Sequence, residues 1–320
     1  MTTSLFACCW TLVPAAAQMP QAPPKKGCDC GSLKLLEPKL KQALAAAEKK
    51  FGAGSTETAV ALTALAHAYA LASEYKKAEP LFARAVAIGQ GRLTDSPADS
   101  PATLAHTLTR QGSMYAAMNS FARAETAFTR ALKLEEPPAK IPSLLAAETA
   151  GELGRLYLNR SQYERAEPLL KRSLTTKEQV LGPAHKELRP ELQSLARMYM
   201  GRRNLPAAEG YLKRDIAIAE KGASAKSRPS MSLTWDIEYL AWVYGQEGNY
   251  ALAEPLLRRA VVDREKVLGA ESPVLVRTLK QYAAVLRHTG KATQADKLDA
   301  RARAIAAKHP GKGGCDGCDG

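Results

Sequence analysis

The amino-acid sequence predicts an all-α fold, an α-solenoid of antiparallel helix pairs stacked into a superhelix. First, residues 162–182 return 87 residues later as 249–269, with eleven of 21 aligned positions identical. Second, Ala166 has counterparts that recur mostly every 42 residues, here called the marker alanines: Ala78, Ala124, Ala208, Ala253 and Ala295. Third, the same pattern of large and small residues precedes each marker. A fixed period of this size indicates a stacked array rather than one globular core.

The pattern before each marker alanine consists of a large apolar residue, a small residue, two free positions and another large residue. It is seen in Leu65-Ala66 with Tyr69 and in Leu153-Gly154 with Tyr157. This tyrosine comes nine residues before the marker, which leaves room for a helix end and a turn. Each repeat is therefore predicted to be two antiparallel helices that approach closely at their small residues. Large residues four positions after the marker share its helical face and fill the gap: Phe82, Phe128, Leu170, Leu212 and Leu257.

These repeats resemble the tetratricopeptide family, specifically the 42-residue variety of the kinesin light chain repeats. The resemblance covers roughly residues 33 to 308 and includes six copies of the pattern. It implies a right-handed superhelix whose first helices line a groove that binds protein partners. A fold by itself does not specify a function, so the residues of the groove must carry the argument.

The chain begins with three segments that precede the full repeats. Residues 1–17 are apolar and end in three alanines, which resembles a signal peptide, although no Lys or Arg comes before the apolar run. This pattern favours export over a cytoplasmic location. Residues 18–31 are rich in proline and predict an extended linker without helix. Residues 32–57 predict a capping half repeat, with Ser32 as the N-cap of a helix over Leu33–Phe51.

Residues 58–308 predict six full repeats, and residues 309–320 a flexible tail rich in Gly and Cys. The repeats begin near Thr58, Thr103, Leu145, Pro190, Trp235 and Arg277. Prolines at equivalent positions predict first turns of second helices, where a missing N–H costs no hydrogen bond: Pro80, Pro168 and Pro255.

Two acidic residues depart from the repeat pattern. Asp215 replaces an alanine that other repeats carry, so we expect weaker packing there unless it faces solvent or pairs with an arginine. Asp299 stands where other repeats have Phe or Leu, which makes the last helix polar enough to end the stack in water.

The charge is unevenly distributed. The chain has a formal net charge of +13, and residues 155–228 contain 16 Lys/Arg against 8 Asp/Glu. This basic centre indicates either an acidic partner or a solvated helix face. Aromatic residues do not interleave the basic run as single-strand binders require, so we expect a protein or peptide partner, suited to acidic side chains, rather than nucleic acid. If nucleic acid did bind, its affinity would fall steeply with salt.

The helical register places a set of residues on the first helices, facing the expected groove. Trp, Tyr and Arg most often become hot spots in protein recognition, and this set is rich in them. Trp242 has an alternative role, because packing between adjacent first helices would have the same periodicity. The predicted partner-binding residues are Arg110, Glu152, Arg155, Arg197, Glu238, Tyr239 and Trp242.

Neither a catalytic site nor a cofactor or metal site is predicted. The five histidines have no neighbouring nucleophile and acid in register, and phosphate-binding and dinucleotide motifs are absent from the sequence. The cysteines occur in the terminal segments as Cys8/Cys9, Cys28/Cys30 and Cys315/Cys318. Such pairs bind metals or carry redox chemistry in other contexts, yet they also serve as inert thiols or crosslinks between chains.

The sequence thus predicts a non-catalytic scaffold that holds a partner peptide or protein in the groove of a helical array. The alternative is an exported metal-binding or thiol-active protein that carries its cysteines on the terminal segments and uses the solenoid as a spacer. We expect no transmembrane helix, because the apolar run of residues 1–17 is too short to span a bilayer. The pattern leaves the oligomeric state, the partner and the pathway open.

Overall fold

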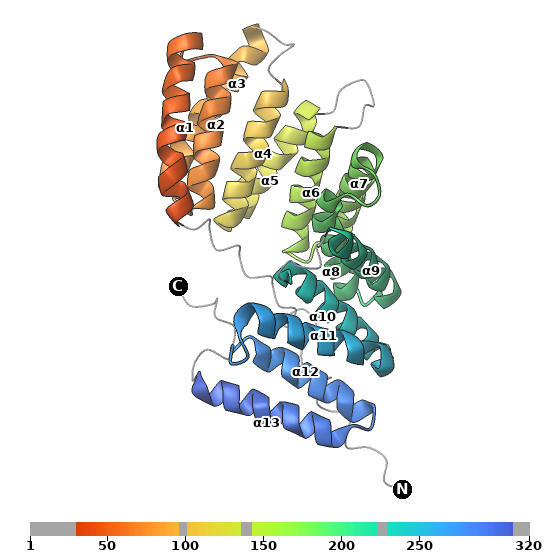
Figure 1. Ribbon diagram of the computed structural model, residues 1–320. Coiled ribbons are helices and arrows are strands. Elements are labelled where there is room, and N and C mark those ends of the chain that lie inside the picture. Colours follow the sequence, from red (N-terminus) through yellow and green to blue (C-terminus); the bar gives the residue numbers. More distant parts are fainter. Residues whose placement is uncertain (1–29, 96–100, 136–142, 223–228, 310–320) are drawn as a thin grey trace. The chain divides into compact units, whose positions relative to one another are not determined.

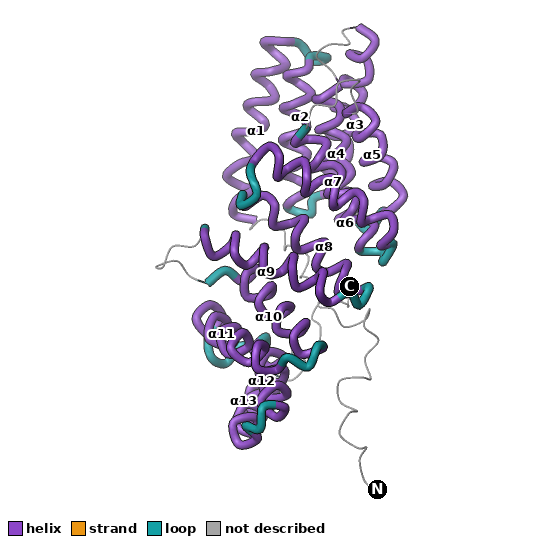
Figure 2. The backbone as a smooth tube through the Cα atoms, turned by 90° about the vertical axis from the view of Figure 1, so that its right-hand side faces the viewer, coloured by secondary structure: helices purple, strands orange, loops and turns teal. Residues whose placement is uncertain are grey.

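The described residues form a helical protein with two compact units. The computed structural model describes residues 30–95, 101–135, 143–222 and 229–309. These residues form α-helices and one short 3-10 helix, and this part of the chain contains no strand (Figure 2). The units are Met1–Val180 and Leu181–Gly320, and each has its own stack of helices. The all-α repeat architecture predicted from the sequence is confirmed.

The first unit stacks its helices as pairs. Helices α2 and α3 pack together, as do α4 and α5, and the first helices of successive pairs also touch, α2 with α4 and α4 with α6 (Figure 1). Its helices are α1 (Cys30–Phe51), α2 (Thr56–Leu71), α3 (Tyr75–Asp95), α4 (Pro101–Ala117), α5 (Phe121–Glu135), α6 (Leu144–Leu158) and α7 (Tyr163–Leu181).

The second unit repeats this arrangement. Helices α8 and α9, α10 and α11, and α12 and α13 form its antiparallel pairs, and α9 packs on α10 and α11 on α12. Its helices are η1 (Lys186–Leu188), α8 (Arg189–Gly201), α9 (Leu205–Lys221), α10 (Met231–Gln246), α11 (Tyr250–Leu268), α12 (Leu275–His288) and α13 (Ala292–Lys308).

The marker alanines lie at the closest approach of the helices. All six have no exposed surface, and the large residues four positions later are buried with them, as the pattern predicts. Gly112 and Gly154 show how tight this approach is. A Cβ atom at Gly112 would meet the Phe128 ring at 2.7 Å, and one at Gly154 would meet Leu170 at 2.8 Å. These two positions therefore need a residue without a side chain.

In three repeats, the tyrosine nine residues before the marker joins the repeat to the helix pair or cap before it. Its hydroxyl donates to a glutamate of the preceding second helix: Tyr69 to Glu37 at 2.8 Å, Tyr157 to Glu125 at 2.7 Å and Tyr244 to Glu209 at 3.0 Å. A buried aromatic ring with a satisfied hydroxyl is a stable joint between repeats. The tyrosine and the Ala-Glu pair are thus structural elements of the repeat.

Two expectations from the sequence are wrong at helix starts. Helix α1 begins at Cys30, so the last two residues of the predicted linker 18–31 are helical, and Ser32 lies inside the helix. The last linker proline is Pro24, and a glycine in a helix costs only about 1 kcal/mol, so nothing forces a later start. The three prolines lie at the sixth residue of their helices, one turn further in than predicted: Pro80, Pro168 and Pro255.

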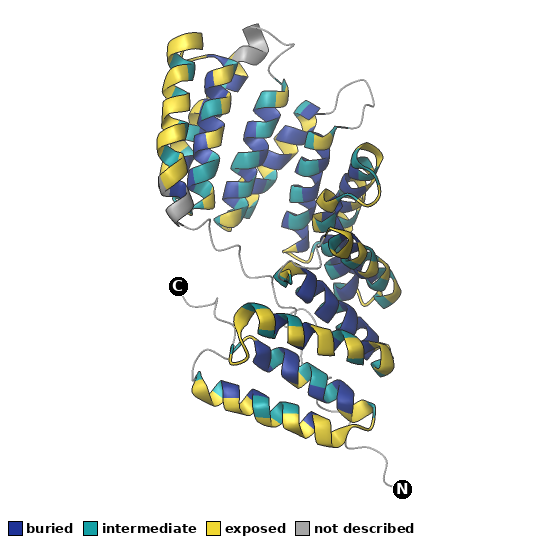
Figure 3. Cartoon of the chain, in the orientation of Figure 1, coloured by how far each residue is buried: buried dark blue, intermediate teal, exposed yellow. Residues whose placement is uncertain are grey.

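The burial pattern separates the helices by role. In the first unit, buried residues concentrate on α2, α4 and α6, while the outer side of α1 is exposed (Figure 3). Leu44 of α1 packs against Ala59, Leu62 and Ala85 and so covers the end of the stack. Among the described helices, none has the length and apolar character needed to cross a membrane.

Candidate partner-binding faces on the first helices

In the first unit, the predicted partner-binding residues lie half-buried on α4 and α6. Arg110 pairs with Glu148 at 3.0 Å, and Arg155 pairs with Glu152 at 2.7 Å. The side chains of all four retain between 27% and 33% of their accessible surface, so the pairs are reachable from solvent. This face therefore presents positive and negative side chains in alternation. Charged groups of a partner can compete for them with their present ion-pair partners.

Two histidines sit beside Arg110. Its Nε lies 3.3 Å from His106 Nε2, and His67 is close enough for the charges of Arg110 and His106 to influence its pKa. Burial first, and then the positive charge of Arg110, lowers the pKa of His67 and of His106 below the ordinary value. Both rings are therefore neutral at pH 7, and the positive charge of this face belongs to the arginines.

Hydroxyl groups connect the first helices of the first unit. Thr63 and Thr107 lie 2.9 Å apart, and Thr109 and Thr149 lie 2.7 Å apart, all four buried. In each pair, the first threonine stands fifteen residues before the marker alanine of its own repeat. The second threonine stands seventeen residues before the marker alanine of the next repeat. We call these contacts rungs. Thr149 also donates to Glu135 at 3.2 Å, and burial raises the pKa of Glu135 to about 7.

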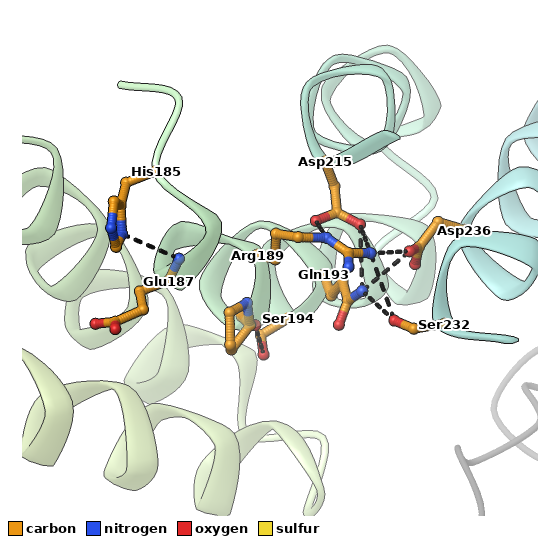
Figure 4. Close-up of polar contacts among 9 residues, drawn as sticks. His185, Glu187, Arg189, Gln193, Ser194, Asp215, Ser232 and Asp236 are labelled. Carbon is orange, nitrogen blue, oxygen red and sulfur yellow. Dashed lines mark hydrogen bonds and ion pairs between the residues drawn. The ribbon is translucent and has the colours of Figure 1, made fainter. Parts of the chain in front are cut away.

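The second unit places the same rungs among charged residues. Gln193 donates to Asp236 at 3.0 Å, and Thr278 donates to Glu238 at 2.7 Å. Arg189 holds the buried Asp215 at 2.9 Å and reaches Asp236 at 3.0 Å, as Figure 4 shows. The expectation that Asp215 needs an arginine partner is confirmed. Burial, and then the nearby Asp215 carboxylate, raises the pKa of Asp236.

Glu238 lies in the core beneath the first-helix face. It is 4% exposed, and both carboxylate oxygens accept bonds from Arg264 at 2.7 Å, with Arg277 at 2.9 Å. The two guanidinium groups lie over the Trp235 ring, each 4.4 Å from its centroid. The helical period assigned Glu238 to the groove, but it did not account for Arg264 reaching over from the second helix. Glu238 therefore organises Arg277 and Trp235 and does not face a partner.

The other predicted residues of this unit are half-buried on α8 and α10. These are Arg197, Tyr239 and Trp242. Burial raises the pKa of the Tyr239 hydroxyl, and this effect outweighs the positive charges of Arg197 and Arg277, which act to lower it. Tyr239 and Trp235 also lie with their ring centroids 6.4 Å apart. The face thus combines aromatic rings with guanidinium groups.

Sequence reasoning missed the residues that anchor these clusters from outside the predicted set, namely Arg189, Asp236, Arg264 and Arg277. A signal was present. The position eleven residues after the marker carries Glu135, Lys177 and Arg264, all buried. A charged residue at a register position that faces the core needs a partner, so the pattern points to internal ion pairs.

The described residues do not bring together a cluster of side chains that could hold a metal ion. No group of three His, Cys, Asp or Glu side chains suitable for a metal occurs among them. His185 caps the Glu187 N–H at 3.3 Å (Figure 4), and His288 stacks on Tyr250 with centroids 4.0 Å apart. Several predictions fall outside the described residues: the signal peptide over 1–17, the tail from residue 310 and the cysteines other than Cys30.

Known proteins with this architecture are repeat proteins. One tetratricopeptide repeat family model matches residues 28–90 and 233–308, and a second matches residues 146–187. No curated protein matches the chain in sequence.

Solved structures share the fold. A putative kinesin light chain from Podosopora anserina with nearly identical TPR-like repeats is 23% identical, with a TM-score of 0.54, over 66% of this chain and 98% of that one. BtubC (BKLC) from P. vanneervenii is 16% identical, with a TM-score of 0.53, over 88% and 93%. The apo form of RapI is 14% identical, with a TM-score of 0.55, over 78% and 99%.

These matches agree with the period, the buried markers and the paired helices of both units. At these identities, the solved structures establish the fold, and the two family models together cover more than half of the chain. The chain belongs to the tetratricopeptide repeat family.

Proposed function

We propose that this protein is a non-catalytic scaffold that binds a segment of a partner protein along the first-helix faces of its repeats. The observation that carries the proposal is the surface of α8 and α10, where half-buried Arg197, Tyr239 and Trp242 lie together with Trp235. Large aromatic and guanidinium groups give the most binding energy per residue in protein interfaces. The tetratricopeptide fold serves in general as a scaffold for protein interactions.

The charge of these faces favours a partner with acidic side chains. In the first unit, Arg110 pairs with Glu148 and Arg155 with Glu152, and both glutamates retain about a third of their accessible surface, so an incoming carboxylate can compete with them. In the second unit, the two guanidinium groups of Arg264 and Arg277 share the single carboxylate of Glu238, which leaves one net positive charge beside Trp235. Complementary charge raises the association rate and selects among partners.

A photocrosslinking amino acid at Trp242 tests the proposal in the native cells. We expect a discrete crosslinked partner at Trp242 and none when the same group replaces Val262, which is exposed on the second helix α11. Crosslinks of equal yield and pattern at both positions would contradict binding on the first-helix face.

Charge reversal tests the role of Arg197. The variant Arg197→Glu should weaken crosslinking at Trp242 at least tenfold, because a favourable charge contact within the second unit becomes repulsive. Its circular dichroism and melting temperature serve as the folding control. A well-folded variant with unchanged crosslinking would remove Arg197 from the proposed interface.

A further inference from the structure

A pocket of about 340 Å³ lies on the first unit, over a different face of α4 from Arg110. Leu108, Gln111 and Tyr115 share one helical face of α4, whereas His106, Arg110 and Ser113 share another. The pocket opens between the second helices α3 and α5. It is lined by Val86, Leu108, Gln111, Tyr115, Ala122, Arg123, Thr126, Ala127 and Arg130.

This pocket exists because the second repeat lacks one large side chain that the other repeats have and carries a polar side chain in place of another. Three positions after the marker, the second repeat has Ala127, and the others have Leu81, Leu169, Tyr211, Leu256 and Leu298. Thirteen positions before the marker, it has Gln111, and the others have Leu65, Leu153, Leu195, Leu240 and Tyr282. Protein interiors are close-packed, so the loss of a large side chain at Ala127 leaves a hollow beside Gln111.

The wall of the pocket is apolar, and its rim is basic. Val86, Leu108, Ala122 and Ala127 supply the apolar surface. On the rim, Arg123 pairs with Glu79 and donates to the Tyr115 hydroxyl at 2.7 Å. Arg130 lies beside the Gln90 side-chain amide and makes no ion pair with any described residue. Among the described residues, the rim therefore keeps one guanidinium without a carboxylate partner.

We propose that this pocket is a second docking site, which receives a large apolar side chain from a segment of a partner protein with acidic residues beside it. The hollow accommodates a side chain like the Leu or Tyr that the other repeats place there, and Arg130 favours a neighbouring carboxylate. The chain's own ends do not offer this combination. Residues 1–29 have a single acidic residue, Asp29, and residues 310–320 have acids but no large apolar residue.

The site is separate from the proposed first-helix interface, so the two succeed or fail independently. The probe is the peptide acetyl-Glu-Phe-Glu-amide, with acetyl-Lys-Phe-Lys-amide as the charge-matched control. Binding is followed on the full chain by methyl NMR signals of Val86, Leu108, Ala122 and Ala127. We expect saturable shifts with the acidic peptide and at least about tenfold weaker binding of the lysine peptide, because rim contacts change from attraction to repulsion.

Ala127→Leu is the decisive variant, because it introduces the residue that most other repeats carry at this position. The leucine side chain fills the hollow in a way that the packing of those repeats already accommodates. It should abolish the shifts of Val86, Leu108 and Ala122 while leaving the melting temperature equal or higher. Arg130→Glu should weaken binding of the acidic peptide without changing the fold. Lys39→Glu, which reverses a charge exposed on α1 outside both proposed sites, should leave binding unchanged.

Three outcomes would overturn the proposal. These are an unchanged response in Ala127→Leu, equal binding of the two peptides, and absence of saturable shifts at millimolar peptide. Binding of octanoate without binding of the acidic peptide would overturn it as well, since the pocket would then serve a small amphiphile and not a protein segment.

Discussion

Glu238 accepts four hydrogen bonds in the core of the second unit, two from Arg264 and one each from Arg277 and Thr278. Arg264 has no exposed surface, and its Nη1 has no hydrogen-bond partner among the described residues. Its charge is therefore sustained by one carboxylate alone. Removing the negative charge of Glu238 would leave the guanidinium of Arg264 buried without a counter-charge, which costs more free energy than losing an ion pair at the surface.

Glu238→Gln should accordingly lower the free energy of unfolding by about 3–5 kcal/mol, as for other broken buried pairs. Urea denaturation followed by tryptophan fluorescence measures the change, because both guanidinium groups lie over the Trp235 ring. The matched control is Glu220→Gln, which breaks the exposed pair with Arg259 and should cost about 1 kcal/mol or less. Equal losses in the two variants would show that the buried cluster has no special role.

Glu135 makes the stability of the first unit sensitive to pH. Burial raises its pKa to about 7 from 4.5, so the folded state keeps a proton that the unfolded chain releases. Between pH 4.5 and 7 the unfolding free energy therefore falls as pH rises, by at most about 1.4 kcal/mol per pH unit. Above pH 7 both states are deprotonated and the contribution is constant.

Glu135→Gln should remove this slope, because the amide stays neutral and can still accept from Thr149. Urea unfolding followed by circular dichroism at pH 5, 6, 7 and 8 compares the variant with the parent chain. The exposed Glu164→Gln provides a control that should keep the parent's slope. A variant that retains the full pH dependence would assign it to other groups.

At the scale of helices, the rungs join neighbouring first helices, α2 to α4 and α4 to α6 in the first unit, where they are hydroxyl pairs. A hydroxyl has one proton, so in the Thr63–Thr107 pair one threonine donates to the other. The acceptor of that bond donates to a carbonyl of its own helix, either Thr63 to Ala59 at 2.8 Å or Thr107 to Thr103 at 2.9 Å. The bond to the carbonyl joins residues four apart in one helix, whereas the bond between the hydroxyls joins two helices. These bonds fix how far one helix slides along its neighbour.

A double-mutant cycle of Thr63→Val and Thr107→Val measures one rung. Each single change should cost about 1 kcal/mol, because it leaves a buried hydroxyl with one partner fewer, and the double variant should cost less than the sum. The coupling energy from urea unfolding is the decisive quantity. Strict additivity of the two changes would mean that the hydroxyl contact contributes nothing.

The sequence was sufficient to predict the helix pairs and not the clusters between them. Spacing located the marker alanines, the tyrosines and the start of every repeat to within a few residues, because backbone periodicity determines these features. The placement of Glu238 could not be predicted in this way. Its environment depends on Arg264, which extends from another helix, and the period of one helix contains no information about how far a neighbour's side chain reaches.

At the scale of the whole molecule, each unit behaves as a row of neighbours. Every repeat contacts mainly the one before and the one after, so stability is distributed along the row. Local departures such as Asp215 and Arg189 are therefore tolerated when both members of a contact change together. This locality also explains why the second repeat can lack the large side chain at Ala127 while its neighbours remain packed.

The rungs also bear on how such a gene can change. The third and fifth repeats still share eleven of 21 residues in their best-matched segment, so a copied repeat would keep the paired-helix pattern. Asp236, however, takes its donors from Arg189 and Gln193 in the repeat before it. A preceding repeat like the first, which has Ala59 and Thr63 at these two positions, would leave this carboxyl group without its guanidinium. A copy that shifts position loses its match, which favours one order of the repeats.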